Sequence, residues 1–314
     1  MRAPTGEHFT LALGNDASQS RAIITEVAAS LRALEVDGVE VIDHYPASSM
    51  PPYGSGTVLA PWPNRIRDGV WVHDGVTRQL DITEVENGNA IHGLLRNRPY
   101  RVAERSEHAI TLEATIFPQH GYPFLVDTSV RYELVGDGIV VTHRIANGSD
   151  AAAPVAVGAH PFLRVGDTAI ADLVLTIPAS TRFEVDDRLN PVAEVPVEAT
   201  GFDLRAGRRV GDLDLDTAFG GVQHGGDGIA RHRLSAPDGR YTEVWQGADF
   251  GFVQAFTPHT YPRPAPDAPG ALGQAVAIEP MTAPPNAFNS GLGLRWLEPG
   301  QEWSGSWGVN YGRG

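Results

Sequence analysis

The 314-residue chain contains no cysteine and no lysine. Without cysteine it can form no disulfide, thiolate metal site or thiol nucleophile, and the sequence leaves the redox compartment open. All 24 basic residues are arginines, and 38 acidic residues bring the formal net charge to −14. The lone pair Arg208-Arg209 does not form a basic cluster. Such an acidic chain argues against nucleic acid and against an anionic membrane surface as partners.

Long apolar runs are also missing. No stretch approaches the ~20 apolar residues of a membrane span, and the opening residues MRAPTGEHFT lack the apolar core of a signal peptide. We therefore expect a cytoplasmic protein that does not contact a membrane. The hydrophobic content of 42% is enough for a sizeable core. The length fits one large domain or two ordinary ones, and we expect a single domain over residues 1–314.

Glycine (35) and proline (24) are plentiful and divide the chain into short apolar segments, which is typical of strands and turns. Residues 126–134 alternate between apolar and polar side chains, a glycine-rich turn follows at 136–138, and residues 139–145 alternate again. This pattern predicts a β-hairpin. Similar short runs lie at 109–117, 153–159, 170–177, 242–247, 252–257, 275–279 and 303–311. Repeated strands of this kind predict an all-β sandwich or barrel.

Two segments need separate comment. Residues 23–34 carry apolar side chains at helical spacing, yet residues 31–36 also alternate and end in the turn Asp37-Gly38, so the pattern fits helix and strand equally. Residues 257–270, TPHTYPRPAPDAPG, are rich in proline and predict a long surface loop rather than a domain linker.

Two titratable residues stand at the end of an apolar run and directly before a proline. His160 precedes Pro161, and Glu279 precedes Pro280. Because proline interrupts strand pairing, we expect both side chains at strand tips, where a rigid scaffold holds them and a cavity is within reach. Partial desolvation there would raise the pKa of the glutamate, and histidine is the commonest proton donor or acceptor near neutral pH. The pair predicts acid/base chemistry; a packed histidine and an arginine-paired glutamate are the structural alternatives.

Three further polar positions lie in loops or turns. Arg65 follows Asn64 in the proline-broken stretch 60–69, where a guanidinium can bind the hydroxyls of a polar ligand or tie the loop to a carbonyl. His92 precedes Gly93, which permits close backbone approach or a positive φ; a packed histidine is the alternative. Asp216 ends an Asp-Leu alternation just before a double glycine and can point into a pocket.

Other sites are disfavoured by missing signatures. The aspartates at 212 and 214 fit a solvated strand face, and the spacing of an EF-hand calcium loop is absent. The chain has no G-x-S-x-G elbow, Walker loop, G-x-G-x-x-G after a strand or H-E-x-x-H. A metal site built from His92, His160 and Glu279 is conceivable, but no local ligand spacing supports it, and we expect no metal.

Taken in order, these stretches resemble the aldose 1-epimerase (galactose mutarotase) family. The matching positions are Pro63-Asn64-Arg65-Ile66, Asn89, His92-Gly93, Gly121-Tyr122-Pro123, Gly158, His160-Pro161-Phe162, Leu215-Asp216, Phe219, Glu279-Pro280, Pro284-Pro285, Ala287, Asn289 and Leu297-Glu298-Pro299-Gly300. The resemblance implies a large antiparallel β-sandwich, the supersandwich, with a sugar cleft on one face. It also implies strands, not a helix, over residues 21–41.

The resemblance further implies the residue roles. Glu279 looks like the general base and His160 like the general acid, while Asn64, Arg65, His92 and Asp216 look like the residues that hold the sugar. For these roles we expect Glu279 to start ionised and His160 to start protonated, its pKa raised by a nearby carboxylate.

The implied reaction is the interconversion of α and β anomers of a free aldohexose, such as glucose or galactose, by ring opening and reclosure. It needs no cofactor, its partner is a monosaccharide, and the protein is expected to be a monomer or homodimer. Arginines near the cleft at 65, 67, 96 and 98 keep a hexose-6-phosphate 1-epimerase as one alternative. A non-catalytic carbohydrate-binding module on the same fold is the other.

Overall fold

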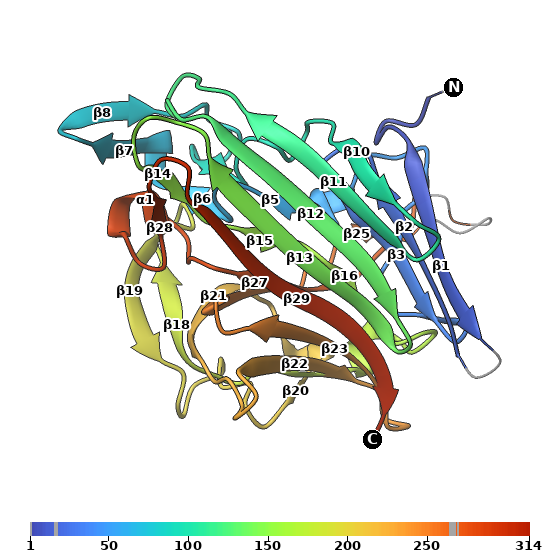
Figure 1. The fold of residues 1–314 in the computed structure, drawn as a ribbon. Coiled ribbons are helices and arrows are strands. Elements are labelled where there is room, and N and C mark those ends of the chain that lie inside the picture. The colour runs from blue at the N-terminus through green and yellow to red at the C-terminus, as the bar shows by residue number, and fades with distance from the viewer. Residues whose placement is uncertain (1, 16–17, 264–267, 269) are drawn as a thin grey trace.

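The computed structural model describes residues 2–15, 18–263, 268 and 270–314, which fold as an antiparallel β-sandwich (Figure 1). The all-β prediction is confirmed. Only one short α-helix, α1 (Ala287–Ser290), occurs in the described residues. Among these residues no helix is long and apolar enough to cross a membrane.

The larger sheet has nine strands in the order β10-β11-β12-β13-β29-β23-β22-β17-β20. Its strands are β10 (Arg101–Arg105), β11 (Ala109–Ile116), β12 (Val126–Val135), β13 (Gly138–Asn147), β17 (Val174–Thr176), β20 (Arg208–Arg209), β22 (Ile229–Ser235), β23 (Arg240–Gly247) and β29 (Glu302–Arg313). β12 and β13 form the predicted hairpin, closed at Val135↔Gly138. Alternate side chains of β12 are buried, as the sequence pattern predicts.

The second sheet has eight strands and carries the site described below. Seven follow the order β19-β18-β21-β24-β27-β15-β5, and β16 pairs with β27 off this path. They are β5 (Val58–Leu59), β15 (Gly158–Ala159), β16 (Phe162–Leu163), β18 (Ala179–Val185), β19 (Pro191–Pro196), β21 (Asp216–Val222), β24 (Phe252–Phe256) and β27 (Val276–Met281).

Smaller sheets complete the fold. A four-stranded sheet contains β1 (His8–Asn15), β2 (Ser18–Thr25), β3 (Leu31–Val36) and β4 (Val39–Glu40). Two-stranded ribbons pair β6 (Arg65–Ile66) with β9 (Ala90–Ile91), β7 (Val70–His73) with β8 (Val76–Gln79), β14 (Ala153–Val155) with β28 (Arg295–Leu297), and β25 (Tyr261–Pro262) with β26 (Leu272–Gly273). Most of residues 21–41 therefore lie in strands, as the family resemblance implies, because β3 pairs with β2 and β4.

Three predicted segments differ in detail. The run 153–159 is broken into β14 and β15, which belong to different sheets. Within 170–177 only β17 pairs, because Ile170–Asp172 form a 3-10 turn. In the predicted loop 257–270, β25 forms part of a ribbon, and residues 264–267 and 269 lie outside the described part of the chain.

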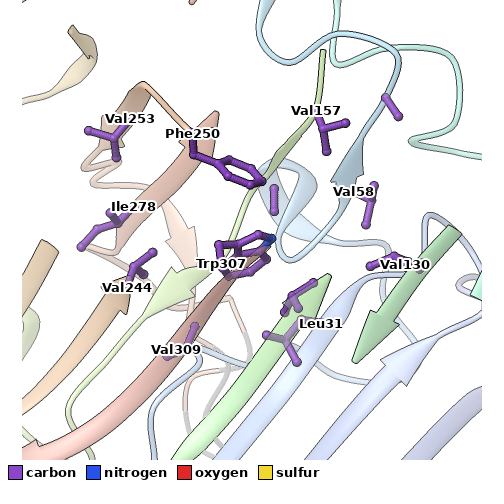
Figure 2. Packing of buried hydrophobic residues seen from close by; sticks show 14 of the residues in the cluster. Leu31, Val58, Val130, Val157, Val244, Phe250, Val253, Ile278, Trp307 and Val309 are labelled. Carbon is purple, nitrogen blue, oxygen red and sulfur yellow. The ribbon is translucent and has the colours of Figure 1, made fainter. Parts of the chain in front are cut away.

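One continuous cluster of buried apolar side chains joins the two large sheets. It includes Trp307 and Val309 from β29 and Val253 and Ile278 from the facing strands β24 and β27. Figure 2 shows Trp307 among these side chains. Each fully buried aliphatic side chain stabilises the fold by about 1.5–3 kcal/mol. Because neighbouring strand residues point to opposite faces, Ile278 anchors β27 in this core while Glu279 faces the other side of the sheet.

Candidate active site

His160 and Glu279 lie opposite each other on neighbouring parts of the second sheet. β15 pairs with β27 at Met281, and β16 pairs with β27 at Ala277, in one continuous register. This register places His160, which lies between β15 and β16, directly across from Glu279. The Nε2 atom of His160 is 3.4 Å from Oε1 of Glu279. Two residues that the sequence separates by more than a hundred positions are therefore in contact.

Glu279 does not end its strand, contrary to the prediction, because β27 continues through Pro280 and stays paired with β24. The other side of β27 explains why a proline fits. There Ile278 donates its backbone N–H to the carbonyl of Pro161 at 3.3 Å, and position 280 points the same way. The same register places Pro280 opposite Ala159 at the end of β15, so its missing N–H removes one bond from this side of β27, while pairing with β24 continues on the other side. His160 does stand at the end of β15, as predicted.

Burial decides the protonation of this pair, whose side chains are only 5% and 2% exposed. Burial lowers the pKa of His160 to about 4. The predicted rise in the pKa of His160 is therefore wrong, because burial disfavours the charged imidazolium. Burial, and then the Asp216 carboxylate, raise the pKa of Glu279 well above its ordinary value, while Arg65 acts in the opposite direction. The predicted rise in the pKa of Glu279 is confirmed, and the two shifts favour the neutral forms of both side chains over the expected ion pair.

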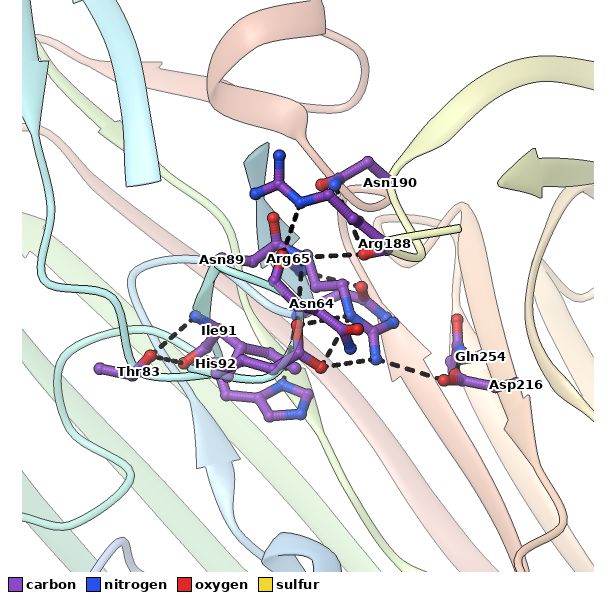
Figure 3. A network of polar contacts seen from close by, with 12 residues as sticks. Asn64, Arg65, Thr83, Asn89, Ile91, His92, Arg188, Asn190, Asp216 and Gln254 are labelled. Atoms are coloured by element: carbon purple, nitrogen blue, oxygen red, sulfur yellow. Dashed lines mark hydrogen bonds and ion pairs between the residues drawn. The ribbon is translucent and has the colours of Figure 1, made fainter. Parts of the chain in front are cut away.

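Arg65, on β6, is a buried ion-pair partner rather than a surface residue; it is 8% exposed. Its Nε and Nη2 atoms donate to both carboxylate oxygens of Glu84 at 2.9–3.0 Å. Nη2 also donates to Oδ2 of Asp216 at 3.2 Å (Figure 3). Although burial opposes the charged form, the two carboxylates raise the pKa of Arg65. The guanidinium is therefore held charged and in a fixed orientation.

Asp216 begins β21, and its Oδ1 atom accepts a hydrogen bond from the side-chain amide of Gln254 (Figure 3). Gln254 on β24 is the register partner of Glu279. His160, Glu279 and Gln254 thus form a row across the sheet, with Asp216 beside it on the next strand. The aspartates at 212 and 214 are exposed, as predicted for a solvated face.

Asn64 and His92 are joined by two hydrogen bonds. The backbone N–H of His92 donates to the carbonyl of Asn64 at 2.9 Å, and the backbone N–H of Asn64 donates to Nδ1 of His92 at 3.3 Å. Burial, followed by His160 and two arginines, lowers the pKa of His92 well below its ordinary value. The ring is therefore neutral. Because Nδ1 accepts, its proton lies on Nε2.

The glycine after His92 explains the local backbone. Gly93 has φ of +73°, and a Cβ there would lie 2.0 Å from the carbonyl oxygen of Ala60. The predicted close approach and positive φ are both confirmed. They bring His92, itself at φ of +63°, against the strand region that carries His160, whose ring centroid is 5.5 Å away.

All six predicted residues line one pocket of about 360 Å³, within the range of small-molecule sites. Sequence reasoning missed several other lining residues, among them Tyr53, Glu84, Gln254 and Phe256. Gln254 could have been predicted from the sequence, because alternation over 252–257 places it on one face of a predicted strand. For Glu84 the local sequence carries no comparable signal.

His92, His160 and Glu279 meet in this pocket without forming a metal site. Within the described ranges, no group of three or more histidine, cysteine, aspartate or glutamate side chains could hold a metal ion. Only two of the four arginines considered as phosphate ligands lie at the pocket. Arg65 and Arg96 line the pocket, whereas Arg67 and Arg98 do not.

The fold and site define a class: antiparallel β-sandwiches with a buried histidine–carboxylate pair in a polar pocket on one sheet. The family model for aldose 1-epimerase matches residues 10–309, and the chain belongs to the aldose 1-epimerase family. It is 31% identical over 298 residues to the uncharacterized protein YihR of Escherichia coli (strain K12), a match that covers 95% of this chain and 91% of that protein.

Solved structures share the fold at lower identity. A GalM/aldose epimerase homologue from C. elegans superposes with a TM-score of 0.83 at 17% identity, over 98% of this chain and 99% of the other. A galactose 1-epimerase from Lactobacillus acidophilus NCFM superposes with a TM-score of 0.76 at 18% identity, again over 98% and 99% of the two chains. These likenesses establish the galactose mutarotase-like sandwich.

Proposed function

We propose that this protein interconverts the α and β anomers of a free aldohexose. The observation that carries the proposal is the buried contact between His160 and Glu279 in the wall of a sugar-sized pocket. Nδ1 of His160 and Oε2 of Glu279 are buried and have no hydrogen-bond partner within the described part of the chain. A carboxyl group and an imidazole held together in this way can exchange protons with two oxygens of one sugar.

The proton balance of the reaction fits a pair that carries one proton. Ring opening requires ionised Glu279 to accept the proton of the O1 hydroxyl and protonated His160 to donate one to O5. The C1–O5 bond breaks and C1=O1 forms. Rotation about C1–C2 and closure by the reverse transfers give the other anomer. No electron or group is transferred overall, so the reaction needs no cofactor.

The pKa shifts bear on the open-chain stage of this reaction. After opening, Glu279 is protonated and His160 is neutral, and these are the states that burial favours. The ring-opening state needs one proton to move across the 3.4 Å contact between the two side chains. Desolvation makes the ion pair of ionised Glu279 and protonated His160 costly. It therefore stabilises the two neutral side chains that are present when the sugar is the open-chain aldehyde.

Pocket charge favours a neutral sugar over a phosphorylated one. Besides Glu279, the lining carries the acidic residues Glu84, Glu86 and Asp216 against Arg65 and Arg96. Arg65 is already bound to two of these carboxylates. A dianionic phosphate would meet this acidic lining with one uncommitted arginine, at a cost in like-charge repulsion.

Arg96 is the one observation in favour of a hexose 6-phosphate. Its Nη2 makes a long hydrogen bond of 3.4 Å to the carbonyl of Thr83, and it belongs to no ion pair among the described residues. By contrast, Arg67 pairs with Asp186 at 3.0 Å. A 6-phosphate substrate would therefore depend on Arg96, and Arg96→Gln would weaken it selectively.

Polarimetry tests the proposal. Fresh α-D-glucose and α-D-galactose should equilibrate faster with the protein than in the buffer blank, and faster than glucose 6-phosphate does relative to its own blank. Faster catalysis on the 6-phosphate would assign the phosphorylated substrate. If no aldose equilibrates faster than its blank while sugars still bind in calorimetry, the carbohydrate-binding module is the correct function.

A further inference from the structure

Glu84 lines the pocket, and the proposed reaction does not use its side chain. It lies on neither large sheet. Its backbone pairs with Asn89, since the N–H of each residue donates to the carbonyl of the other at 3.0 and 3.1 Å. The side-chain amide of Asn89 also donates to Oε2 of Glu84 at 3.1 Å. Glu84 is thus fixed at both its main chain and its carboxylate.

This fixed carboxylate determines how Arg65 is presented. Glu84 accepts hydrogen bonds from the Nε–H and one Nη2–H of Arg65, and Asp216 accepts one from the other Nη2–H. Nη1 is the one guanidinium nitrogen of Arg65 left without a hydrogen bond in the described residues. A guanidinium is a planar fork, so fixing two of its nitrogens also fixes the direction of the third.

Asp216 is the group that would respond if Glu84 were absent. It is the second carboxylate bound to Arg65, and its side chain is 29% exposed compared with 9% for Arg65. An unpaired buried charge is strongly disfavoured. Without Glu84, the guanidinium of Arg65 would therefore rotate to form a closer ion pair with Asp216. Asp216 would then lose its contact with Gln254 and its freedom to accept from a sugar hydroxyl.

We propose that Glu84 is a positioning residue for substrate binding: it holds the Arg65 guanidinium so that Nη1 faces the sugar and Asp216 stays available to it. The inference rests on the proposed function. It assigns Glu84 to recognition and not to proton transfer, because no hydrogen bond joins it to His160 or Glu279 among the described residues. Its loss should therefore appear in KM or Kd more than in kcat.

Glu84→Gln and Glu84→Ala test this assignment. Glu84→Gln keeps the volume and one acceptor but loses the charge and the two-point contact. Glu84→Ala removes both acceptors. We expect KM for the best aldose to rise about 10-fold in Glu84→Gln and further in Glu84→Ala, as for the loss of a hydrogen bond to a charged group, with kcat within about threefold of the parent.

A matched control separates positioning from stability. Glu243 on β23 is also a buried glutamate bound by arginine, accepting from Nε of Arg233 at 2.7 Å, and it is not among the residues that line the pocket. Glu243→Gln should lower the melting temperature at least as much as Glu84→Gln does and leave KM unchanged. Formate added to Glu84→Ala should restore part of the sugar affinity by refilling the carboxylate position, with no such gain in the parent.

The outcomes distinguish the two proposals. An active parent with unchanged KM in both Glu84 variants overturns the positioning role and leaves the proposed function intact. A fall in kcat that exceeds the rise in KM also overturns it. A parent that binds sugar without turnover fails the proposed function, and the Kd of the variants by calorimetry then decides the role of Glu84. A parent that binds no sugar overturns both.

Discussion

His160 and Glu279 face each other across neighbouring strand segments of one sheet, and a proline follows each of them. The continuous register of β15 and β16 along β27 sets their opposition. Their contact is 3.4 Å long and almost completely buried. Since a buried pair of this kind titrates as a unit, its behaviour is described by the number of protons on the pair rather than by two independent groups.

Removing either member of the pair should abolish turnover. Glu279→Gln loses the proton acceptor with little change in volume, and His160→Asn loses the proton donor. General acid/base groups are each typically worth 10²–10⁴-fold in rate, so both variants should approach the buffer blank in polarimetry. Glu279→Gln should still bind sugar with a Kd within a few-fold of the parent. Near-parental kcat in either variant would show that the roles are misassigned.

The pH dependence of kcat/KM should have an alkaline limit set by Glu279. The active pair carries one proton, and burial favours the protonated form of Glu279 by raising its pKa. Activity should fall as pH rises through that value and the pair loses its proton. It should also fall below about pH 4, where His160 gains a second one.

Two variants should move this alkaline limit in opposite directions. Asp216→Asn removes a negative charge that raises the pKa of Glu279, so the limit should move to lower pH. Arg65→Gln removes the positive charge that lowers it, so the limit should move to higher pH. Profiles of kcat/KM, corrected for the spontaneous reaction at each pH, measure both shifts. A shift of the two variants in the same direction would contradict the electrostatic account.

Acid should destabilise the protein through His143, which is fully buried on β13 and accepts a hydrogen bond from the indole N–H of Trp307 at 2.9 Å. Burial lowers the pKa of His143 to about 3. As pH falls below about 6.5, the unfolded chain binds a proton that the folded chain cannot, so stability is lost until the pH reaches about 3. Between pH 7.5 and pH 5 this one group accounts for about 2 kcal/mol.

Substituting this histidine tests the acid-stability prediction. His143→Gln keeps an acceptor for Trp307 but removes the titration. Urea unfolding at pH 7.5 and pH 5 should show a pH-dependent loss of stability about 2 kcal/mol smaller than in the parent. His120→Gln, at an exposed histidine, is the control and should keep the parental loss. An unchanged loss in His143→Gln would rule His143 out as its source.

Gly93→Ala should damage both stability and activity. The added Cβ would meet the Ala60 carbonyl at 2.0 Å, at a φ of +73°, and would displace the neighbouring His92. Gly75→Ala is the matched control, since Gly75 has φ of +72° and nothing within 4 Å of a built Cβ. The left-handed backbone alone costs about 1–2 kcal/mol, so unfolding experiments should show a loss in Gly93→Ala at least twice that in Gly75→Ala. Equal losses would show that the contact with Ala60 has no effect.

The sequence predicts the parts of this molecule that depend on local pattern. Alternation and turn residues were sufficient for the hairpin of β12 and β13, and Gly93 after His92 predicted the close backbone approach. The ordered family motifs brought six residues together that lie in one pocket. Residues 21–41 could not be decided by pattern, because helical and alternating spacing coincide there.

What the sequence could not supply depends on contacts between distant segments. The proline rule placed Glu279 at a strand tip, but whether Pro280 breaks the strand depends on β15 and β16, which a local pattern does not reveal. Proximity to a carboxyl group predicted a raised pKa for His160, but the degree of burial decides the sign. Glu84 was missed because its importance comes entirely from its contact with Arg65.

The most direct test of the central claim, that His160 and Glu279 transfer protons to and from one sugar, is to measure exchange between the two anomers at equilibrium. Two-dimensional exchange NMR on D-galactose or D-glucose at neutral pH should show cross-peaks between the α and β anomeric protons with the parent protein. Neither Glu279→Gln nor His160→Asn should give them at the same concentration. Cross-peaks of parental intensity in either variant, or none with the parent for any aldose tested, would contradict the account.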